Sequence, residues 1–409
     1  MVSLQEKLLL TERGQEWLSQ FAEHDQDTAC RLVRSLTLVS HSKFARAIGQ
    51  MVQETAASVG HPVALFAIRE LRDKARADFG RALAERRERS SIDATPAGSD
   101  LGSEAIVAAN IRSLSRAHRN LLNHPNVAMM RASRCKAIFL VDDIVGSGQR
   151  AREYLAVLWE NRSIRSWWSR KNIEFVVISF AATEDGEKRL RKLKPSPAVV
   201  YNRACPTLRS LPWSQQLKSE ASDLCQTYGK RTSKHYFLFG YQGSAATLVF
   251  EHGCPNNVPA LFWAPSTDRY PWKALFPART VLPAESSAFP LEIVRRDPLT
   301  LLVEAGQQRL AERIGLPVSI SRDTLLVLAY AEKGIRSTGA LCFATGMDEN
   351  GCRTLILACI AWGFLTIRRR LTAAGLAELN AARRNQAISV KVASLGEDAY
   401  YPSMLRRAT

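Results

Sequence analysis

The sequence has no segment that is long and apolar enough to cross a membrane. Its longest uncharged apolar run, residues 354–367, is shorter than the roughly 20 residues that a membrane helix requires. The N-terminal segment carries charges within its apolar patch and has no small-residue cleavage site, so no signal peptide is predicted. We therefore expect a soluble cytoplasmic protein of bacterial type that has no membrane partner.

Patterns that bind structural metals are also missing. The eight cysteines and seven histidines form no CxxC pair and no Cys/His quartet, so a zinc site is not predicted. Glu251, His252 and Cys254 are residue types that bind metals, but their spacing matches no metal-site pattern. An irregular loop is the favoured interpretation of that segment, and the scattered cysteines indicate reduced thiols.

Acidic residues are too few to balance the basic ones. The chain has 56 lysines and arginines against 39 acidic residues, which gives a formal net charge of +17. An excess of this size favours polyanionic partners, meaning nucleic acid or phosphate-rich ligands. The 409 residues, of which 46% are hydrophobic, are enough for two or three domains with buried cores.

Four short apolar runs alternate with helical patterns in the first half of the chain. They are residues 62–68, 137–141, 175–180 and 199–201. Their order predicts an α/β core with an open parallel sheet, in which ligands bind at the carboxyl ends of the strands. Apolar residues at helical spacing predict an N-terminal helical cap over residues 1–58. Further strands are expected at residues 236–239 and 247–250.

Residues 136–152 combine a strand, two acids, a small-residue turn and the start of a helix. The apolar run ends at Asp142 and Asp143, and Gly146, Ser147 and Gly148 precede the helical pattern. Glycines allow close backbone approach, and the unpaired amides of a helix N-terminus attract an anion. Because carboxylates repel a phosphate, Asp142 and Asp143 are expected to hold sugar hydroxyls or a divalent metal beside it.

The segment VDDIVGSGQR resembles the phosphoribosyl-diphosphate (PRPP) loop of type I phosphoribosyltransferases. The resemblance implies that Asp142 and Asp143 hold the ribose of PRPP, whose Mg²⁺ they could also contact. It implies that the 5′-phosphate lies against the turn formed by Gly146, Ser147, Gly148 and Gln149. Arg150 stands where that family usually has threonine, and an arginine can bind phosphate bidentately. An ordinary surface strand, turn and helix is the alternative interpretation.

Segments on either side of this loop extend the resemblance. In the family, the first core strand leads into a loop that contacts pyrophosphate, which makes Arg69 a candidate catalytic residue; an ion pair with Glu70 is an equal alternative. Ser103 and Glu104 open a helix where the family has its mobile catalytic hood. We therefore take Glu104 as a candidate catalytic residue and Ser103 as a candidate phosphate ligand, although a serine there also serves as an N-cap.

The sequence also resembles a phosphoribosyltransferase-like group found in bacterial conflict, or anti-phage, systems. This resemblance covers roughly residues 10–280 and includes the GSE stretch at residues 102–104, the PNN stretch at 255–257 and the WK…FPAR stretch at 272–279. Members of that group are often joined to a winged helix and encoded beside retron reverse transcriptases. The resemblance implies a toxin effector restrained by a reverse transcriptase and its RNA–DNA hybrid.

The C-terminal part follows the order of a winged helix. Helical patterns at residues 322–331, 337–344 and 350–362 precede a predicted hairpin at 364–372 and a last helix at 375–382. This order would place the third helix in a major groove and the hairpin tip along phosphates. The candidate nucleic-acid-binding residues are Arg353, Arg368, Arg369 and Arg370. Because the third helix is otherwise apolar, docking to a protein or dimerisation is an open alternative.

These patterns predict five segments. They are the helical cap (1–58), a phosphoribosyltransferase-like domain (59–290), a connector of helical character (291–317), a winged-helix domain (318–385) and a tail (386–409). We favour an anti-phage effector that binds Mg²⁺–PRPP and transfers its phosphoribosyl group to an unknown acceptor. A PRPP-sensing transcription regulator without transferase activity is the alternative. The candidate partners are DNA or an RNA–DNA hybrid, a reverse transcriptase and a second copy of the chain.

Overall fold

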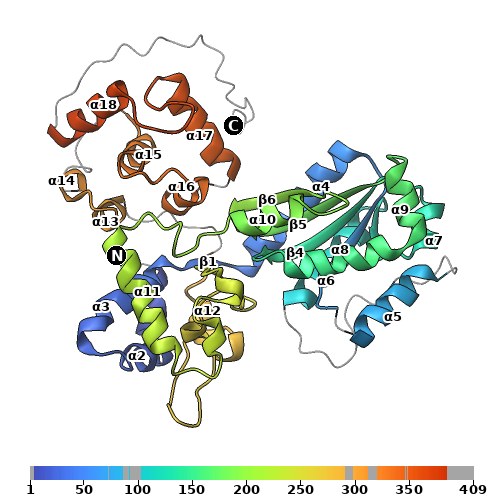
Figure 1. The fold of residues 1–409 in the computed structure, drawn as a ribbon, viewed down its shortest axis with the longest axis horizontal. Helices are drawn as coiled ribbons and strands as arrows, with labels where there is room; N and C mark the ends of the chain where they lie inside the picture. The colour runs from blue at the N-terminus through green and yellow to red at the C-terminus, as the bar shows by residue number, and fades with distance from the viewer. Residues whose placement is uncertain are drawn as a thin grey trace, which may run out of the picture.

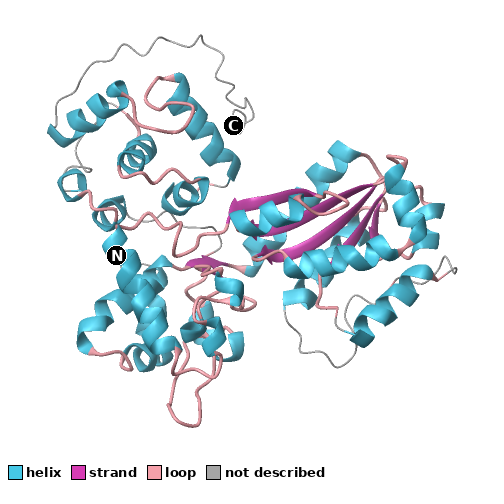
Figure 2. Ribbon diagram, in the orientation of Figure 1, coloured by secondary structure: helices cyan, strands magenta, loops and turns pink. Residues whose placement is uncertain are grey.

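The structure is a computed structural model that describes residues 4–71, 73–85, 92, 103–290, 298–311, 320–345, 347 and 349–384. Its elements form three parts (Figure 1): a core built on strands, a unit of N-terminal helices with irregular segments, and a C-terminal group of helices. Most of the strands gather in the first of these parts (Figure 2). The predicted phosphate turn lies in this core.

The core is a sheet of five parallel strands in the order β3-β2-β4-β5-β6. The strands are β2 (Val63–Ala67), β3 (Leu121–Asn123), β4 (Ala137–Val145), β5 (Glu174–Ala182) and β6 (Ala198–Ala204). β4 is buried along its whole length, as expected for a central strand whose sheet is covered on both faces. The predicted open parallel sheet is confirmed. The sheet has one strand more than predicted, β3, which is too short to show a periodic pattern in the sequence.

Helices cover both faces of the sheet. Along β4, Phe139 and Val141 join one hydrophobic cluster, whereas Ile138 and Leu140 join another, because alternate side chains of a strand point to opposite faces. The first face is covered by α4 (His41–Val59) and α6 (Ser103–Ala117). The second face is covered by α5 (Asp73–Ala84), α7 (Val127–Ala132), α8 (Gln149–Glu160), α9 (Arg162–Ser169) and α10 (Glu184–Arg191).

The strand that carries the acid pair is longer than predicted. The apolar run ends at Val141, but β4 continues to Val145. The reason is β5 beside it, which pairs Asp142 with Ser179 and Ile144 with Ala181. Asp142 and Asp143 therefore lie within the strand, where backbone pairing holds them, and the turn begins only at Gly146.

The N-terminal residues divide between two parts of the molecule. Only α4 covers the sheet; α1 (Leu4–Leu10), α2 (Glu12–Leu18) and α3 (Glu23–Ser35) pack with one another and, through α3, on α11 (Gln215–Gly229). Trp17 stacks on Phe262 with ring centroids 5.4 Å apart, and its indole N–H donates to the carbonyl of Leu261 at 3.1 Å. The predicted helical N-terminus is confirmed. Contacts between residues so far apart in sequence leave no trace in helical periodicity, so the sequence does not show that its helices pack on two parts of the molecule.

A second sheet joins this unit to the core. Its two parallel strands are β1 (Thr37–Val39) and β7 (Leu248–Phe250), of which the sequence predicts only β7. The strand predicted at residues 236–239 is wrong. The chain forms the 3₁₀ turn η1 (His235–Phe237) there, and Phe237 packs on Trp263 with ring centroids 5.7 Å apart. The remaining short elements are η2 (Tyr241–Gly243), η3 (Ala260–Phe262), η4 (Pro277–Arg279) and α12 (Pro283–Ser286).

The C-terminal part has the predicted winged-helix order. The connector contains α13 (Pro298–Glu304) and α14 (Gln308–Ala311), and the domain consists of α15 (Arg322–Glu332), α16 (Thr338–Thr345), α17 (Glu349–Ala361) and α18 (Ala373–Arg384). The predicted hairpin is reduced to one bridge between Leu365 and Leu371. The predicted tail lies outside the described residues.

The winged-helix part docks on the edge of the core sheet. α16 and α17 pack against β6, where the buried side chain of Arg203 donates from Nη2 to the carbonyl oxygens of Cys342 at 3.2 Å and Met347 at 2.9 Å. A cation buried among carbonyl oxygens fixes the α16–α17 turn to the strand. The contact also covers an edge strand that would otherwise be open to pairing with another chain.

The part of the chain that the structure describes contains no membrane-spanning helix, no disulfide bond and no metal-binding cluster. Within these residues, no helix combines the length and the apolar character needed to span a bilayer. The eight cysteines are free thiols. The described residues also contain no group of three metal-ligating side chains, and Glu251 instead accepts hydrogen bonds from the His41 amide at 2.8 Å and the Ser286 hydroxyl at 2.7 Å.

Candidate functional site

The acid pair lies where the strand order of the sheet reverses. β2 pairs with β3 on one side and with β4 on the other, so the chain leaves the carboxyl ends of β2 and β4 in opposite directions. Such a switch point opens a crevice in which open α/β sheets bind their ligands. Asp142 and Asp143 lie near the end of β4, and Glu70 follows β2. The fold therefore places these residues at the edge where the sequence predicts a ligand.

Arg150 pairs with both acids. Its Nη2 lies 3.5 Å from Asp142 Oδ2 and 3.5 Å from Asp143 Oδ1. The two acid side chains are only 3% and 5% exposed, whereas the arginine side chain is 34% exposed. The residue that replaces the family's threonine thus reaches back from the first turn of α8 over both carboxylates.

The start of α6 closes over the same group. Arg150 Nη1 lies 3.6 Å from Glu104 Oε1, which also accepts a hydrogen bond from the amide of Glu70 at 3.2 Å. Ser103 donates a hydrogen bond to Asp143 and thereby lowers the pKa of that carboxyl. The structure therefore brings Ser103, Glu104 and Arg150 together with the acids. Ser103 is the first residue of α6.

The two aspartates differ in how readily they hold a proton. Burial raises the pKa of Asp142 well above its ordinary value, and the Arg150 guanidinium only partly opposes this. Burial acts in the same direction on Asp143, but Arg150 and hydrogen bonds from Asp142 and Ser103 outweigh it and lower the Asp143 pKa. Asp142 therefore keeps a proton to higher pH than Asp143. Burial likewise raises the pKa of Glu104.

The phosphate turn is held by close contacts with other segments. A Cβ at Gly146 would lie 2.0 Å from Nδ2 of Asn257, so only glycine permits this approach. Asn257 belongs to the PNN stretch and donates from Nδ2 to Ser244 Oγ at 3.0 Å. Gly148 is the N-cap of α8 with a φ of 76°, a left-handed conformation that favours glycine.

The loop after β5 is hydrogen-bonded to the phosphate turn. The Thr183 hydroxyl donates to the carbonyl of Gly146 at 2.5 Å and accepts from the amide of Gly186 at 3.0 Å, which caps α10. Ser147 Oγ accepts from the amide of Gln149 at 3.3 Å. These hydrogen bonds fix the shape of the turn. The first-turn amides of α8 have no partner inside the helix, so they stay available to a ligand that lies against the turn.

Arg69 lies away from the acid pair. Its side chain is buried, and its guanidinium carbon lies 5.7 Å from the centre of the Phe79 ring in α5. Its charge helps to lower the pKa of His124, whose burial is the larger cause. The structure places Arg69 in the packing of β2 against α5, and it forms no ion pair with Glu70 in the described residues. Its predicted contact with pyrophosphate stays a prediction.

His252 approaches the acid pair without any signal in the sequence. Its ring stacks on Phe250 with centroids 4.9 Å apart, and its charge interacts with that of Asp143. Burial lowers its pKa to about 4. Neither ring nitrogen has a hydrogen-bond partner in the described part of the chain. A neutral imidazole with both nitrogens available is therefore a further candidate site residue.

The four arginines predicted to bind nucleic acid lie in different settings. Arg353 Nη2 pairs with Glu349 Oε1 at 2.9 Å, and Arg369 Nη1 donates to the Thr338 hydroxyl at 3.1 Å. Arg368 and Arg370 are exposed to solvent. The winged-helix part also exposes three large apolar side chains, which suits docking to a protein as well as to nucleic acid: Leu357, Trp362 and Ile367.

Comparisons with known protein families agree with this division. A family model described as PRTase-CE, in which PRTase stands for phosphoribosyltransferase, matches residues 15–278. A second model, described as wHTH-PRTase associated, matches residues 325–407 and so begins in α15. Searches of the curated proteins and of the solved structures returned no match. The first match spans the N-terminal helices, the sheet and the PNN stretch together.

Proposed function

The chain belongs to the PRTase-CE family, and from this premise we propose that it binds Mg²⁺–PRPP and transfers the phosphoribosyl group to an acceptor. One observation carries the proposal. The buried pair Asp142 and Asp143 lies at the switch point of the sheet, immediately before a glycine turn that opens α8. This arrangement has a group for each part of a phosphoribosyl ligand.

Different residues of the site bind different parts of the ligand. The carboxylates accept hydrogen bonds from the ribose hydroxyls, and the amides of the α8 turn bind the 5′-phosphate. Mg²⁺ arrives with the diphosphate and neutralises the charge of this leaving group. Positive charge that develops on the ribose is stabilised by the nearby Asp143, whose lowered pKa keeps it ionised.

Arg150 supports the alternative function, a sensor that binds PRPP without transferring it. Its guanidinium occupies the carboxylates that a ribose needs, so binding requires this side chain to turn away. Because Arg150 also holds Glu104 at the start of α6, its movement releases that helix. A ligand that prefers the released state then shifts the conformation without any chemistry.

We propose further that the protein acts as the effector of a retron-type anti-phage system. The support is the resemblance of the GSE and PNN stretches, the associated winged-helix match and the net charge of +17. The test has two steps: the proposal requires that a reverse transcriptase is encoded beside this protein, and the two proteins are then co-expressed. The effector proposal requires both co-purification and toxicity when the reverse transcriptase is omitted; a harmless protein that purifies alone contradicts it.

Calorimetric titration with PRPP, with and without Mg²⁺, tests the site. We expect Mg²⁺-dependent binding that Asp142→Asn with Asp143→Asn weakens at least 100-fold, because two hydrogen bonds to charged groups, about 1.5–3 kcal/mol each, are lost. A pyrophosphate assay on the same sample separates the two functions. Release of pyrophosphate supports transfer, whereas binding without release supports the sensor. Unaltered binding by the double variant would refute the site.

A further inference from the structure

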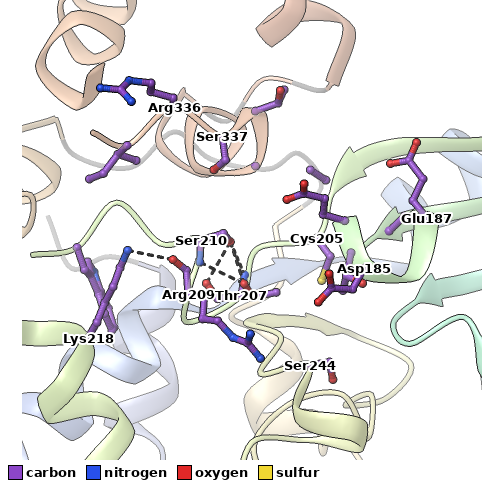
Figure 3. Close-up of a pocket in the computed structure, with 18 of the residues that line it drawn as sticks. Asp185, Glu187, Cys205, Thr207, Arg209, Ser210, Lys218, Ser244, Arg336 and Ser337 are labelled. Carbon is purple, nitrogen blue, oxygen red and sulfur yellow. Dashed lines mark hydrogen bonds between the residues drawn. The ribbon is translucent and has the colours of Figure 1, made fainter. Parts of the chain in front are cut away.

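A large cavity lies between the core sheet and the winged-helix part. Its volume is about 1020 Å³. One wall comes from the ends of β5 and β6 and from the segment between β6 and α11, and the other comes from the turn between α15 and α16 (Figure 3). In Figure 3, Arg336 and Ser337 lie opposite Arg209 and Ser210. We call this space the interdomain cleft. Gly146 and Ser147 of the phosphate turn line one end of it.

Cationic side chains from both walls line the interdomain cleft. On the core side, Arg189 Nη1 donates to Gln242 Oε1 at 2.8 Å, and Arg209 Nη2 donates to the carbonyl of Gly243 at 3.1 Å. Lys218 Nζ donates to the carbonyl of Arg209 at 3.0 Å. Each of these cations is held in place by an uncharged oxygen.

The winged-helix wall contributes two more. Arg369 Nη1 donates to the carbonyl of Arg336 at 3.1 Å and to the Thr338 hydroxyl at 3.1 Å. The Nε atom of Arg336 is buried and has no hydrogen-bond partner in the described part of the chain. A buried guanidinium N–H without a partner costs free energy, so its position is explained best by an acceptor that a ligand brings.

Carboxylates balance these charges only in part. Seven cations and four acids line the cleft, since Lys333 and Arg353 add to the five cations above, and positive charge exceeds negative by three. Three of the acids are paired, Glu184 with Lys188, Glu187 with Arg191 and Glu349 with Arg353. Asp185 and the five cations form no ion pair within the described residues. Burial also lowers the pKa of Lys218, because its ammonium group is partly removed from water. Like charges that share a cleft raise the local concentration of anions and favour their binding.

We propose that the interdomain cleft binds the phosphate backbone of a nucleic-acid strand. Guanidinium groups anchored through one nitrogen keep further N–H groups for phosphate oxygens. The cations come from α10, α11 and its preceding segment, the α15–α16 turn and the wing, and so lie on both walls of the cleft. A strand with several phosphates can contact more of them than one small anion can. The volume also lies at the upper limit of roughly 300–1,000 Å³ for small-molecule pockets. A strand suits both features.

The proposal gives the winged helix a different mode of binding from the one predicted. α17 packs against β6, so its N-terminal part is used for docking to the chain's own core. A strand in the interdomain cleft instead contacts the α15–α16 turn and Arg369. It passes beside Gly146 and Ser147, next to the site proposed for PRPP, without using the acid pair.

Fluorescence anisotropy with a labelled 12-nucleotide dT strand tests the proposal on the full-length protein. We expect binding that weakens with salt and that Arg209→Glu with Arg336→Glu reduces at least tenfold. The slope of log K against log salt should fall by about 1–1.5, the value for two phosphates on a single strand. Arg162→Glu with Arg165→Glu is the matched control: both arginines are exposed on α9, away from the cleft, and should leave affinity unchanged within twofold.

Other results would overturn the proposal. Wild-type protein that does not bind the strand, an equal loss in the α9 control, or a loss confined to Arg368→Glu with Arg370→Glu would exclude the cleft. Full displacement of the strand by micromolar pyrophosphate would assign the cleft to a free phosphate anion instead. If the glutamate variant does not fold, Arg209→Gln with Arg336→Gln is measured, for which a threefold loss or more is expected.

The same measurements separate this inference from the proposed PRPP site. Asp142→Asn with Asp143→Asn should leave strand binding intact, and Arg209→Glu with Arg336→Glu should leave Mg²⁺–PRPP binding intact in calorimetry. Failure of one site thus does not imply failure of the other.

Discussion

The acid site and the interdomain cleft flank the same turn but balance their charges in opposite ways. At the acid site, Asp142, Asp143 and Glu104 share one guanidinium, that of Arg150. In the interdomain cleft, Arg189, Arg209, Lys218 and Arg369 are anchored on uncharged oxygens, and the Nε atom of Arg336 has no partner in the described residues. Side chains that pair with each other keep the acid site closed until a ligand competes for them. These five cations of the interdomain cleft have no acidic partner in the described residues and can bind an anionic ligand directly.

Replacing the balancing cation should have the largest effect. Arg150→Thr leaves two carboxyl groups with almost no solvent access without their cation, and breaking a buried pair from one side costs about 3–5 kcal/mol. Because Arg150 is partly exposed, we expect the free energy of unfolding to fall by about 3 kcal/mol in urea denaturation at pH 7.

Arg336→Gln is the matched control for that variant. It removes an arginine that pairs with no carboxylate in the described residues, so the free energy of unfolding should change by less than about 0.5 kcal/mol. If the two variants lose equal stability, the contrast between the acid site and the interdomain cleft is wrong.

Filling the space beside the shared turn should have a smaller effect. Gly146→Ala places a methyl group 2.0 Å from Asn257 Nδ2, and overpacking of this kind costs about 1–3 kcal/mol. Combining it with Asn257→Ala should restore part of the loss in a double-mutant cycle measured by thermal denaturation. In contrast, Gly49→Ala in α4 meets Leu114 at an ordinary 3.5 Å and should stabilise by up to about 1 kcal/mol. Additive effects at 146 and 257 would contradict the contact.

An effect of similar size concerns the pH dependence of the acid site. Burial lowers the pKa of His252 to about 4 from 6.5, so only the unfolded chain takes up a proton between these values. The neutral ring therefore contributes stability that is complete above pH 6.5 and is lost as pH falls through 4. His252→Gln should reduce the drop in the free energy of unfolding between pH 6.5 and pH 4 by about 1–3 kcal/mol.

Urea denaturation from pH 4 to 8 measures this change. Part of the slope should persist, because burial lowers the pKa of His124 as well, to about 3. His24→Gln, at a side chain that is 82% exposed, is the control and should leave the profile unchanged. A profile unaltered by His252→Gln would remove this residue from the acid site.

Patterns of short range were predicted well. The run from Ala137 to Val141, the two acids and the glycine turn follow one another within a single strand–turn–helix unit, so their order in sequence is their order in space. The length of β4 was not predicted because β5, a separate segment, supplies the pairing that extends it. The aromatic residues at 236–239 were misread as a strand because their contact with Trp263 lies far along the chain.

The amino-acid sequence by itself determined the parallel sheet, the acids followed by the glycine turn, the winged-helix order and the excess of positive charge. Periodicity and net charge are local or summed properties, so a sequence states them directly. Only the tertiary structure decided that Arg150 covers the acids, that Asn257 presses on Gly146 and that His252 approaches Asp143. It also decided which cations face the interdomain cleft. These relations depend on the docking of α6, the PNN stretch and the winged helix on the sheet, which no spacing in the sequence encodes.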